Sequence, residues 1–356
     1  GEEWASLGPF GGLGVTPSIS DLASFDGRIY AVGALQSAGR EVVNGAAKLE
    51  GSRWQPLGEP GRGNYSVVEA ADSGVFVGGS FDEIGGISAS NVAKFDGSEW
   101  TALHDDGLLG VDGRVRAISL TPFGVIVGGS FSQAGQVVAD NIALWNGSSW
   151  ERLGAGVSAD VKAIAHSPDA IYVGGEFIEA GGEPAPYIAK YDAGAWSPLL
   201  DAGGLGLNGP VSTIYFVDGC VLAGGSFTQA GSYSAGGIAK WCNGQWLEFG
   251  PDLSVFSSVT VRSIAQVADV FFFLGRFVSA SDGSVSRVIR TTKDELLEFP
   301  EVTGLSFWIL ETIESLDEHV YLAGTFTVFG DWPSVNIARY HEQSDFIFIS
   351  GFESPK

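Results

Sequence analysis

Short apolar runs separated by glycine-containing turns recur along the whole 356-residue chain. The clearest copy covers residues 125–153, where Val-Ile-Val-Gly-Gly-Ser-Phe is followed by a loop and then by Asn-Ile-Ala-Leu-Trp. Short runs rich in β-branched and aromatic residues indicate β-strands. No stretch of about 10–15 residues keeps the 3.6-residue period of an amphipathic helix, so the pattern predicts an all-β chain.

Seven such units follow one another, each with four apolar runs and a period of about 48 residues. Four strands at this period are typical of a β-propeller blade. The sequence therefore predicts one domain, residues 1–356, folded as a seven-bladed propeller of four-stranded antiparallel blades. The blades are expected at residues 19–58, 67–103, 115–153, 161–199, 211–249, 261–299 and 310–349.

The chain opens with a fragment of this repeat. Trp4–Gly8 matches the end of the later units, and no earlier part of its own unit precedes it. We expect these residues to pair as the outermost strand of the seventh blade, because this would tie the two ends of the ring together. Residues 345–349 occupy the same position in their own repeat and compete for it, and residues 350–356 are expected to form a short tail.

Two local features of the unit have a physical reason. Asx-Gly pairs between the third and fourth runs predict tight hairpins with two residues at positive φ, at Asp96-Gly97, Asn146-Gly147 and Asn243-Gly244. Paired glycines inside a strand indicate close approach of a neighbouring group. We expect that space to be filled by the aromatic residue of the third run, which is Phe95, Trp145, Tyr191, Trp241 or Tyr340.

The order Gly-Gly, aromatic residue and Trp resembles the kelch repeat and the secreted bacterial propellers related to it, with an architecture like the central domain of galactose oxidase. The closing residues 345–353 look like a short C-terminal tail of secreted proteobacterial proteins. The resemblance implies the fold and no particular activity, because propellers host many functions. A copper site like that of the propeller oxidases needs converging His and Tyr ligands, which His104, His166, His319 and His341 do not offer.

The net charge of −23 reflects a shortage of basic residues, since 19 Lys and Arg stand against 42 Asp and Glu. Binding to nucleic acid or to anionic membranes needs clusters of Lys and Arg, so neither is an expected partner. No run of about 18 apolar residues predicts a membrane span. The chain begins at Gly1 and has no Met, which favours a processed, exported protein. We expect a bacterial protein that is secreted, periplasmic or on the cell surface.

The two cysteines stand outside the repeat pattern. A hairpin centred near Gly231 would place Cys220 and Cys242 directly opposite each other on neighbouring strands. Facing cysteines in an exported chain predict a disulfide. The alternative is two separate buried thiols.

An acidic loop and one tryptophan are the candidate binding residues. Asp105, Asp106 and Asp112 lie in a loop that leads to an inner strand, and their oxygens suit Ca²⁺. The loop lacks the ligand order of an EF-hand, and a solvated acidic turn is the alternative. Trp332 falls outside the repeat positions and is the aromatic candidate for ligand contact.

No convergent catalytic set stands out. Inner-strand positions carry Glu69, Glu311 and Glu314 among many small residues. The leading hypothesis is an exported, non-enzymatic scaffold that binds a protein or glycan partner through one face. One alternative is an enzyme that acts on a polysaccharide or similar polymer at the channel mouth. Another is a structural subunit of an extracellular assembly, with Phe271–Phe273 of the degenerate sixth unit at the contact.

Overall fold

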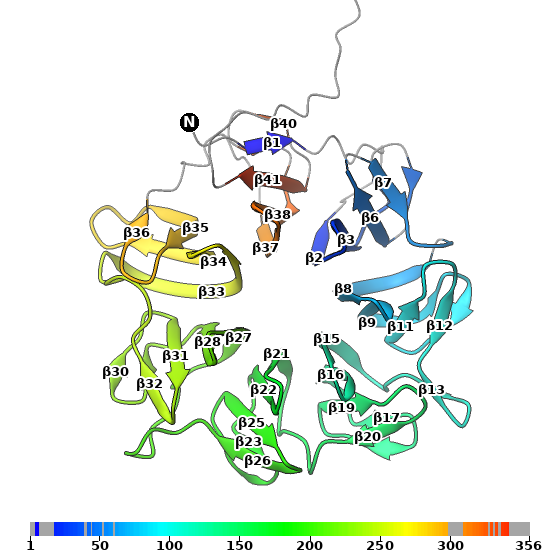
Figure 1. Ribbon diagram of the computed structural model, residues 1–356, viewed down its shortest axis with the longest axis horizontal. Helices are drawn as coiled ribbons and strands as arrows, with labels where there is room; N and C mark the ends of the chain where they lie inside the picture. The colour runs from blue at the N-terminus through cyan, green and yellow to red at the C-terminus, as the bar shows by residue number, and fades with distance from the viewer. Residues whose placement is uncertain are drawn as a thin grey trace, which may run out of the picture.

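Seven β-sheets stand in a ring around a common axis in the computed structural model (Figure 1). The structure describes residues 4–6, 18–38, 41–43, 45–51, 53–59, 61–297, 309–326, 328–329, 332–333 and 336–341. Within these residues there is no helix, and each blade is an antiparallel sheet. The all-β, seven-bladed prediction is therefore confirmed.

The blades follow the predicted units in order. The first four consist of β2 (Ile19–Phe25), β3 (Arg28–Gly33), β6 (Ala46–Glu50) and β7 (Arg53–Pro56); β8 (Arg62–Ala71), β9 (Gly74–Ile84), β11 (Val92–Phe95) and β12 (Trp100–Ala102); β15 (Arg114–Thr121), β16 (Gly124–Ser130), β19 (Ile142–Trp145) and β20 (Trp150–Arg152); and β21 (Val161–His166), β22 (Ala170–Gly175), β25 (Ile188–Asp192) and β26 (Ala195–Pro198).

The remaining three blades are built in the same way. They consist of β27 (Val211–Val217), β28 (Cys220–Gly225), β31 (Ile238–Cys242) and β32 (Gln245–Leu247); β33 (Phe256–Val267), β34 (Val270–Ser279), β35 (Val285–Thr291) and β36 (Leu296–Leu297); and β37 (Ile309–Leu316), β38 (His319–Thr325), β41 (Ile337–His341) and β1 (Trp4–Ser6).

Small hairpins decorate one end of the blades, between the second and third strands and before the third blade. We call this end the hairpin face. Its short strands are β4 (Ser37–Ala38), β5 (Glu41–Val42), β10 (Ile87–Ser88), β13 (His104–Asp105), β14 (Leu108–Leu109), β17 (Gln133–Ala134), β18 (Val137–Val138), β23 (Glu179–Ala180), β24 (Glu183–Pro184), β29 (Gln229–Ala230), β30 (Tyr233–Ser234), β39 (Val328–Phe329) and β40 (Trp332–Pro333).

The N-terminal strand closes the ring as predicted. β1 pairs antiparallel with β41 and places Trp4 opposite Tyr340 and Ser6 opposite Ala338. The last blade is thus built from both ends of the chain (Figure 1). Leu7, Gly8, the competing residues 345–349 and the tail 350–356 lie outside the described residues.

The first glycine of each pair makes room for the next blade. A Cβ on Gly224 would lie 2.6 Å from Cγ1 of Val261, the first inward residue of the following innermost strand. Gly128 and Gly174 meet the corresponding valine of the next blade in the same way. The prediction that third-run aromatic residues fill this space is therefore wrong, because a β-branched side chain from the neighbouring blade already occupies it.

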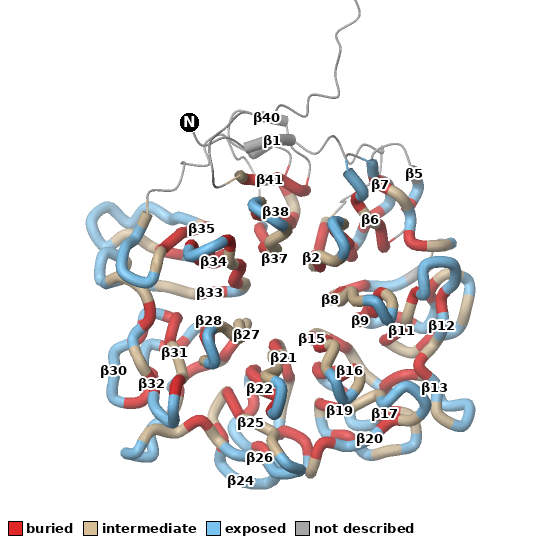
Figure 2. Tube along the Cα trace, viewed as in Figure 1, coloured by how far each residue is buried: buried red, intermediate tan, exposed pale blue. Residues whose placement is uncertain are grey.

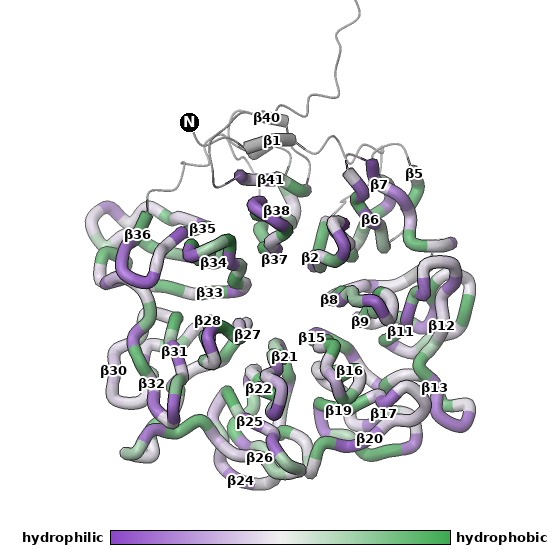
Figure 3. Tube along the Cα trace, in the orientation of Figure 1, coloured by the Kyte–Doolittle hydropathy of each residue, from purple (hydrophilic) through white to green (hydrophobic). Residues whose placement is uncertain are grey.

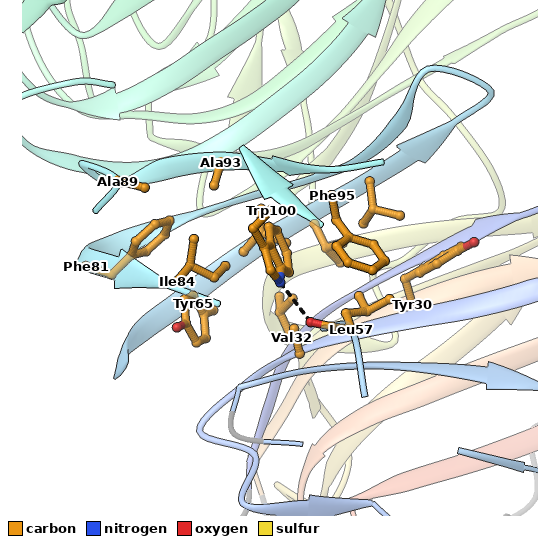
Figure 4. Packing of buried hydrophobic residues seen from close by; sticks show 14 of the residues in the cluster. Tyr30, Val32, Leu57, Tyr65, Phe81, Ile84, Ala89, Ala93, Phe95 and Trp100 are labelled. Carbon is orange, nitrogen blue, oxygen red and sulfur yellow. Dashed lines mark hydrogen bonds between the residues drawn. The ribbon is translucent and has the colours of Figure 1, made fainter. Parts of the chain in front are cut away.

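Those aromatic residues pack instead on the outer tryptophans. The rings of Phe95 and Trp100 lie 5.2 Å apart, and three further blades repeat the pair at 5.0–5.3 Å. Trp100 Nε1 also donates a hydrogen bond of 2.8 Å to the carbonyl oxygen of Leu57 in the preceding blade (Figure 4). Trp196 and Trp246 make the same bond to Leu153 and Leu199. These three tryptophans therefore join neighbouring blades.

The Asx-Gly turns are of two kinds. Asn243 and Gly244 have φ of +50° and +80°, which is the tight two-residue hairpin that the sequence predicts. Asp96-Gly97 is different, because the hairpin loop holds four residues and Asp96 Oδ1 accepts hydrogen bonds from the N–H groups of Ser98 and Glu99. Asn146-Gly147 follows this second pattern, so the two-residue prediction is wrong for both.

Buried hydrophobic residues lie inside and between the blades, whereas most exposed residues lie in the turns and hairpins (Figures 2 and 3). The run Phe271–Phe273 of the sixth blade is fully buried, at 0% exposure. Leu274 stands where other blades carry the first glycine, and it too is buried. The expectation that these phenylalanines mark a contact surface is wrong, because they fill the core in place of the lost repeat residues.

The predicted disulfide is present. Cys220 and Cys242 are bonded across β28 and β31, with a Cα–Cα distance of 4.9 Å. The bond closes the hairpin of the fifth blade at the end away from the hairpin face, beside the Asn243-Gly244 turn. No other cysteine exists in the chain.

The glycine contact makes a testable prediction about stability. Gly224→Ala should lower the free energy of unfolding by about 1–3 kcal/mol, because its Cβ would overlap Val261. Gly236→Ala in the same blade is the control, since its Cβ would make an ordinary contact of 3.6 Å with Leu253. That variant should stay within about 0.5 kcal/mol of the parent in urea unfolding. Equal losses in both variants would contradict the proposed seam.

The disulfide makes a second prediction. Cys220 and Cys242 are separated by 22 residues, so opening the bond should cost about 3 kcal/mol through the entropy of the unfolded chain. A reductant should therefore lower the melting temperature of the parent protein. The double variant Cys220→Ser/Cys242→Ser should melt at the reduced protein's temperature and ignore the reductant. A mass spectrum of the unreduced parent with two free thiols would contradict the bond.

Candidate functional site

The wall of the central channel consists of the seven innermost strands, each of which contacts the next around the ring (Figure 1). The strand registers place one residue of each blade at the same level of this wall. Four of these residues are small, and three are large and polar. The seven are Ala23, Ser119, Ala165, Ala265, Glu69, Tyr215 and Glu314.

Asp21 lies one level away and joins three blades. Its Oδ2 accepts a hydrogen bond of 3.0 Å from the N–H of Val68 in the second blade. Its Oδ1 accepts one of 3.1 Å from the hydroxyl of Thr312 in the seventh blade. Burial raises the pKa of Asp21 to about 6, although these hydrogen bonds oppose the shift. The carboxyl group therefore holds the first blade to both of its neighbours.

Glu314 and Glu69 flank Asp21 on the neighbouring blades. The hydroxyl of Ser24 donates a hydrogen bond of 2.7 Å to Glu314 Oε1. Burial raises the pKa of Glu314 to about 8, and the negative charge of Asp21 adds to the shift. Burial and the charges of Asp21 and Glu314 likewise raise the pKa of Glu69 to about 8. Both glutamates are thus largely protonated at neutral pH.

This carboxyl group cluster can exchange protons near neutral pH, but the structure does not make it a metal site. Among the residues that the structure describes, no group of three or more His, Cys, Asp or Glu side chains is placed to hold a metal ion. Tyr215 faces the same channel from the fifth blade, and burial followed by the charge of Glu314 raises the pKa of its hydroxyl. The cluster is therefore a set of carboxyl groups whose charges raise one another's pKa.

The sequence pointed to part of this cluster only. Glu69 and Glu314 are inner-strand residues as expected, whereas Glu311 lies at the channel mouth, where its Oε2 is 3.4 Å from Nη1 of Arg262. Asp21 was missed. Aligning the repeats would have revealed Asp21, because it is the one charged residue at its position. The equivalent residues of the other blades are Val67, Ala117, Ala163, Thr213, Ser263 and Thr312.

The acidic loop before the third blade has a structural role at Asp112. Its Oδ1 accepts hydrogen bonds from the N–H groups of Ser132 and Gln133, at 2.8 and 2.9 Å. Partial burial opposes ionisation, but these bonds prevail and hold the pKa of Asp112 below its usual value. Ser158 and Asn208 make the same bonds in the next two blades. Asp112 therefore fastens its blade's hairpin.

The other two loop carboxylates lie nearby. Asp105 ends strand β13, and Asp106 follows it with φ of +44° and its Oδ2 3.4 Å from Gln136 Nε2. Calcium binding by Asp105, Asp106 and Asp112 stays a prediction. Trp332 begins strand β40 and pairs with Phe329 in the small hairpin of the seventh blade, on the hairpin face. Its ligand contact also stays a prediction.

Exposed apolar side chains gather on the hairpin face. In the described part of the chain, eleven large apolar side chains are exposed, and nine of them belong to this end of the blades. Phe123 and Leu296 lie at the opposite end. The nine are Val42, Leu108, Val138, Ile178, Leu205, Tyr233, Val255, Val285 and Ile309.

A groove of about 580 Å³ lies between the second and third blades. Phe123, which is 53% exposed, and the half-buried Trp145 line it together with Lys94, His104 and Asn146. None of the three channel carboxyl groups reaches this groove. The cavity and the carboxyl group cluster are therefore separate features.

Comparison with known proteins shows the fold and no family. No family model and no curated protein matches the chain. The computationally designed protein Ika8 is 15% identical, with a TM-score of 0.51 over 96% of this chain and 100% of its own. YCF48, solved with a D1 peptide, is 14% identical, with a TM-score of 0.53 over 96% of each chain. The kelch-like and galactose-oxidase-like resemblance is thus supported only as a propeller.

The raised pKa of Glu69 makes a prediction about pH. Folding raises the pKa of Glu69 from 4.5 to about 8, so its contribution to stability is fully present below pH 4.5, falls as the pH rises from there, and is lost above pH 8. Glu69→Gln stays neutral, so at about pH 9 it should be more stable than the parent by about 1 kcal/mol or more. At about pH 4 the two should match in urea unfolding. The exposed control Glu99→Gln should follow the parent at both pH values; if Glu69→Gln does so too, the channel assignment is wrong.

Proposed function

We propose that this protein is a binding scaffold that holds a protein partner on its hairpin face. The β-propeller serves in general as a protein-binding scaffold, because its rigid ring presents blade-specific loops at one end. The observation that carries the proposal is the gathering of nine of the eleven exposed large apolar side chains on this face. The end of the propeller with more exposed apolar side chains is the better candidate for a docking surface.

A protein partner fits this surface better than a glycan. Eight of the nine exposed side chains are Val, Leu or Ile, and Tyr233 is the single aromatic residue among them. Aliphatic side chains offer apolar area to a peptide, whereas sugars prefer to lie flat on aromatic rings. The repeat tryptophans cannot serve that purpose where they are buried between blades, as Trp100 and Trp246 are.

We also infer that the scaffold works outside the reducing cytosol. Its disulfide between Cys220 and Cys242 is of the kind that persists in secreted and periplasmic proteins. In the described part of the chain, no helix is long and apolar enough to cross a membrane. An extracellular or periplasmic location accords with both findings.

An enzyme at the channel is the second candidate. The observation in its favour is that Glu69 and Glu314 converge on the channel with raised pKa, as a general acid does. Glycoside hydrolysis needs one protonated and one ionised carboxyl group, and Asp21 supplies the more acidic member. The blade-joining hydrogen bonds of Asp21 favour a structural role over this one.

A peptide library tests the scaffold. Phage-displayed random peptides selected on the immobilised folded protein should bind the parent and the Phe123→Ser control equally well. The variant Val138→Ser/Ile178→Ser should bind them at least about tenfold more weakly, because two exposed aliphatic side chains of the hairpin face are lost. Failure to enrich any peptide, or equal binding by all three proteins, would overturn the proposal.

A further inference from the structure

Three cationic side chains meet at the mouth of the channel on the hairpin face. Arg114 and Arg116 stand at the start of β15 in the third blade, and Lys162 stands at the start of β21 in the fourth. The whole chain has only 19 basic residues and a net charge of −23. A local gathering of cations is therefore the exception on this protein.

The blade fold does not require these cations. Arg116 and Lys162 occupy the bulge near the start of the innermost strand, where the register with the second strand shifts. In three other blades the same position is serine, at Ser20, Ser66 and Ser212. In the sixth and seventh blades it carries Arg262 and Glu311, which pair with each other. The third and fourth blades alone therefore keep an excess of positive charge there.

The acidic side chains around these cations do not fully balance them. Arg116 Nε lies 2.7 Å from Asp160 Oδ2, and Lys162 Nζ lies 2.6 Å from Glu176 Oε1. Arg114 Nη2 donates a hydrogen bond of 3.0 Å to the neutral hydroxyl of Ser66, and Arg114 also lies within the charge influence of Asp160. Three cations thus share two carboxylates.

Arg114 is also left with an unsatisfied donor. Its buried Nε has no hydrogen-bond partner, and neither has the buried Oδ1 of Asp160. Arg116 Nε lies in ion-pair distance of Asp160 Oδ2 without hydrogen-bond geometry. Burial and the neighbouring charge of Arg116 lower the pKa of Arg114, and together they outweigh the opposing effect of the Asp160 charge. A buried donor without a partner is costly. An anionic group at the mouth would offset the repulsion between Arg114 and Arg116.

We propose that the channel mouth between the third and fourth blades binds a carboxylate of a peptide segment in the protein partner, held by Arg114 with Arg116 and Lys162. This inference rests on the proposed scaffold function and names the chemistry that it recognises. A guanidinium group matches a carboxylate with two parallel hydrogen bonds. Val138 and Ile178, exposed on the hairpins of the same two blades, would receive aliphatic side chains of that segment.

The partner segment therefore carries an acidic group next to aliphatic residues. The carboxylate comes either from a Glu or Asp side chain or from the partner's C-terminus. Because the protein is strongly negative overall, the charge of the mouth acts only over a short range. Ionic strength near physiological, where the Debye length is about 8 Å, screens the remaining repulsion.

Defined peptides test this proposal. The probe is a fluorescent hexapeptide of alternating leucine and glutamate, compared with its leucine–glutamine counterpart, each with a free or an amidated C-terminus. In fluorescence anisotropy the parent should bind the glutamate peptide at least about tenfold more tightly than the amidated glutamine peptide, which has no carboxylate. Binding of the glutamine peptide with a free C-terminus alone would support the proposal and assign the carboxylate to the terminus.

Matched variants tie this binding to the mouth. Lys162→Ser, which installs the serine of three other blades, and Arg114→Ser should each weaken binding at least about tenfold. Lys293→Ser removes the same charge from an exposed pair with Asp218 and should leave binding unchanged. Equal affinity for carboxylate-bearing and carboxylate-free peptides, or parental affinity in both mouth variants, would overturn the proposal. If library peptides bind without an acidic group, the carboxylate site at the mouth is wrong but the scaffold function stands. If no peptide binds at all, both proposals are wrong.

Discussion

The propeller depends on a close approach, repeated at four of the seven blades, between a glycine of the second strand and a valine of the next blade. Where Gly224 lies, any side chain would collide with Val261. The glycine weakens its own strand, but it lets two sheets approach closely enough to pack without voids. The tryptophan bond from Trp100 to the backbone of Leu57 then joins the blades at the outer rim. Blades are therefore held at both their inner and their outer ends.

This arrangement explains where the chain is free to vary. Residues at the seams recur because every blade needs them, and their recurrence argues against a ligand role. The strand ends on the hairpin face carry no such demand, which is why the bulge position holds Ser66 in one blade and Arg116 in the next. Blade-specific charge and exposed apolar side chains on that face therefore mark the surface on which function is built.

Much of the fold could be predicted from the sequence, because the glycine and tryptophan positions recur at a regular spacing of about 48 residues. The period and the orphan Trp4 fragment predicted the seven blades and their closure, and the cysteine positions predicted the disulfide. What fills the space beside the glycines could not be read, because Val261 comes from another unit some forty residues away. The role of Asp21 could not be predicted for a related reason. Its hydrogen-bond partners Val68 and Thr312 belong to other blades and come close to it only when the ring closes.

The carboxyl groups of the channel wall and the cations of the channel mouth are both partly buried, but only the carboxyl groups can lose their charge. In the wall, Glu69 and Glu314 lie near Asp21, and burial and the neighbouring negative charge raise the pKa of both glutamates. These glutamates can keep their protons, so they need no positive charge from a partner. At the mouth, Arg114 cannot shed its charge at any physiological pH. Its neighbour Arg116 already engages Asp160. Asp160 offsets this charge only in part, because burial and Arg116 still lower the pKa of Arg114. The mouth, and not the wall, is therefore where we propose that a partner's carboxylate binds.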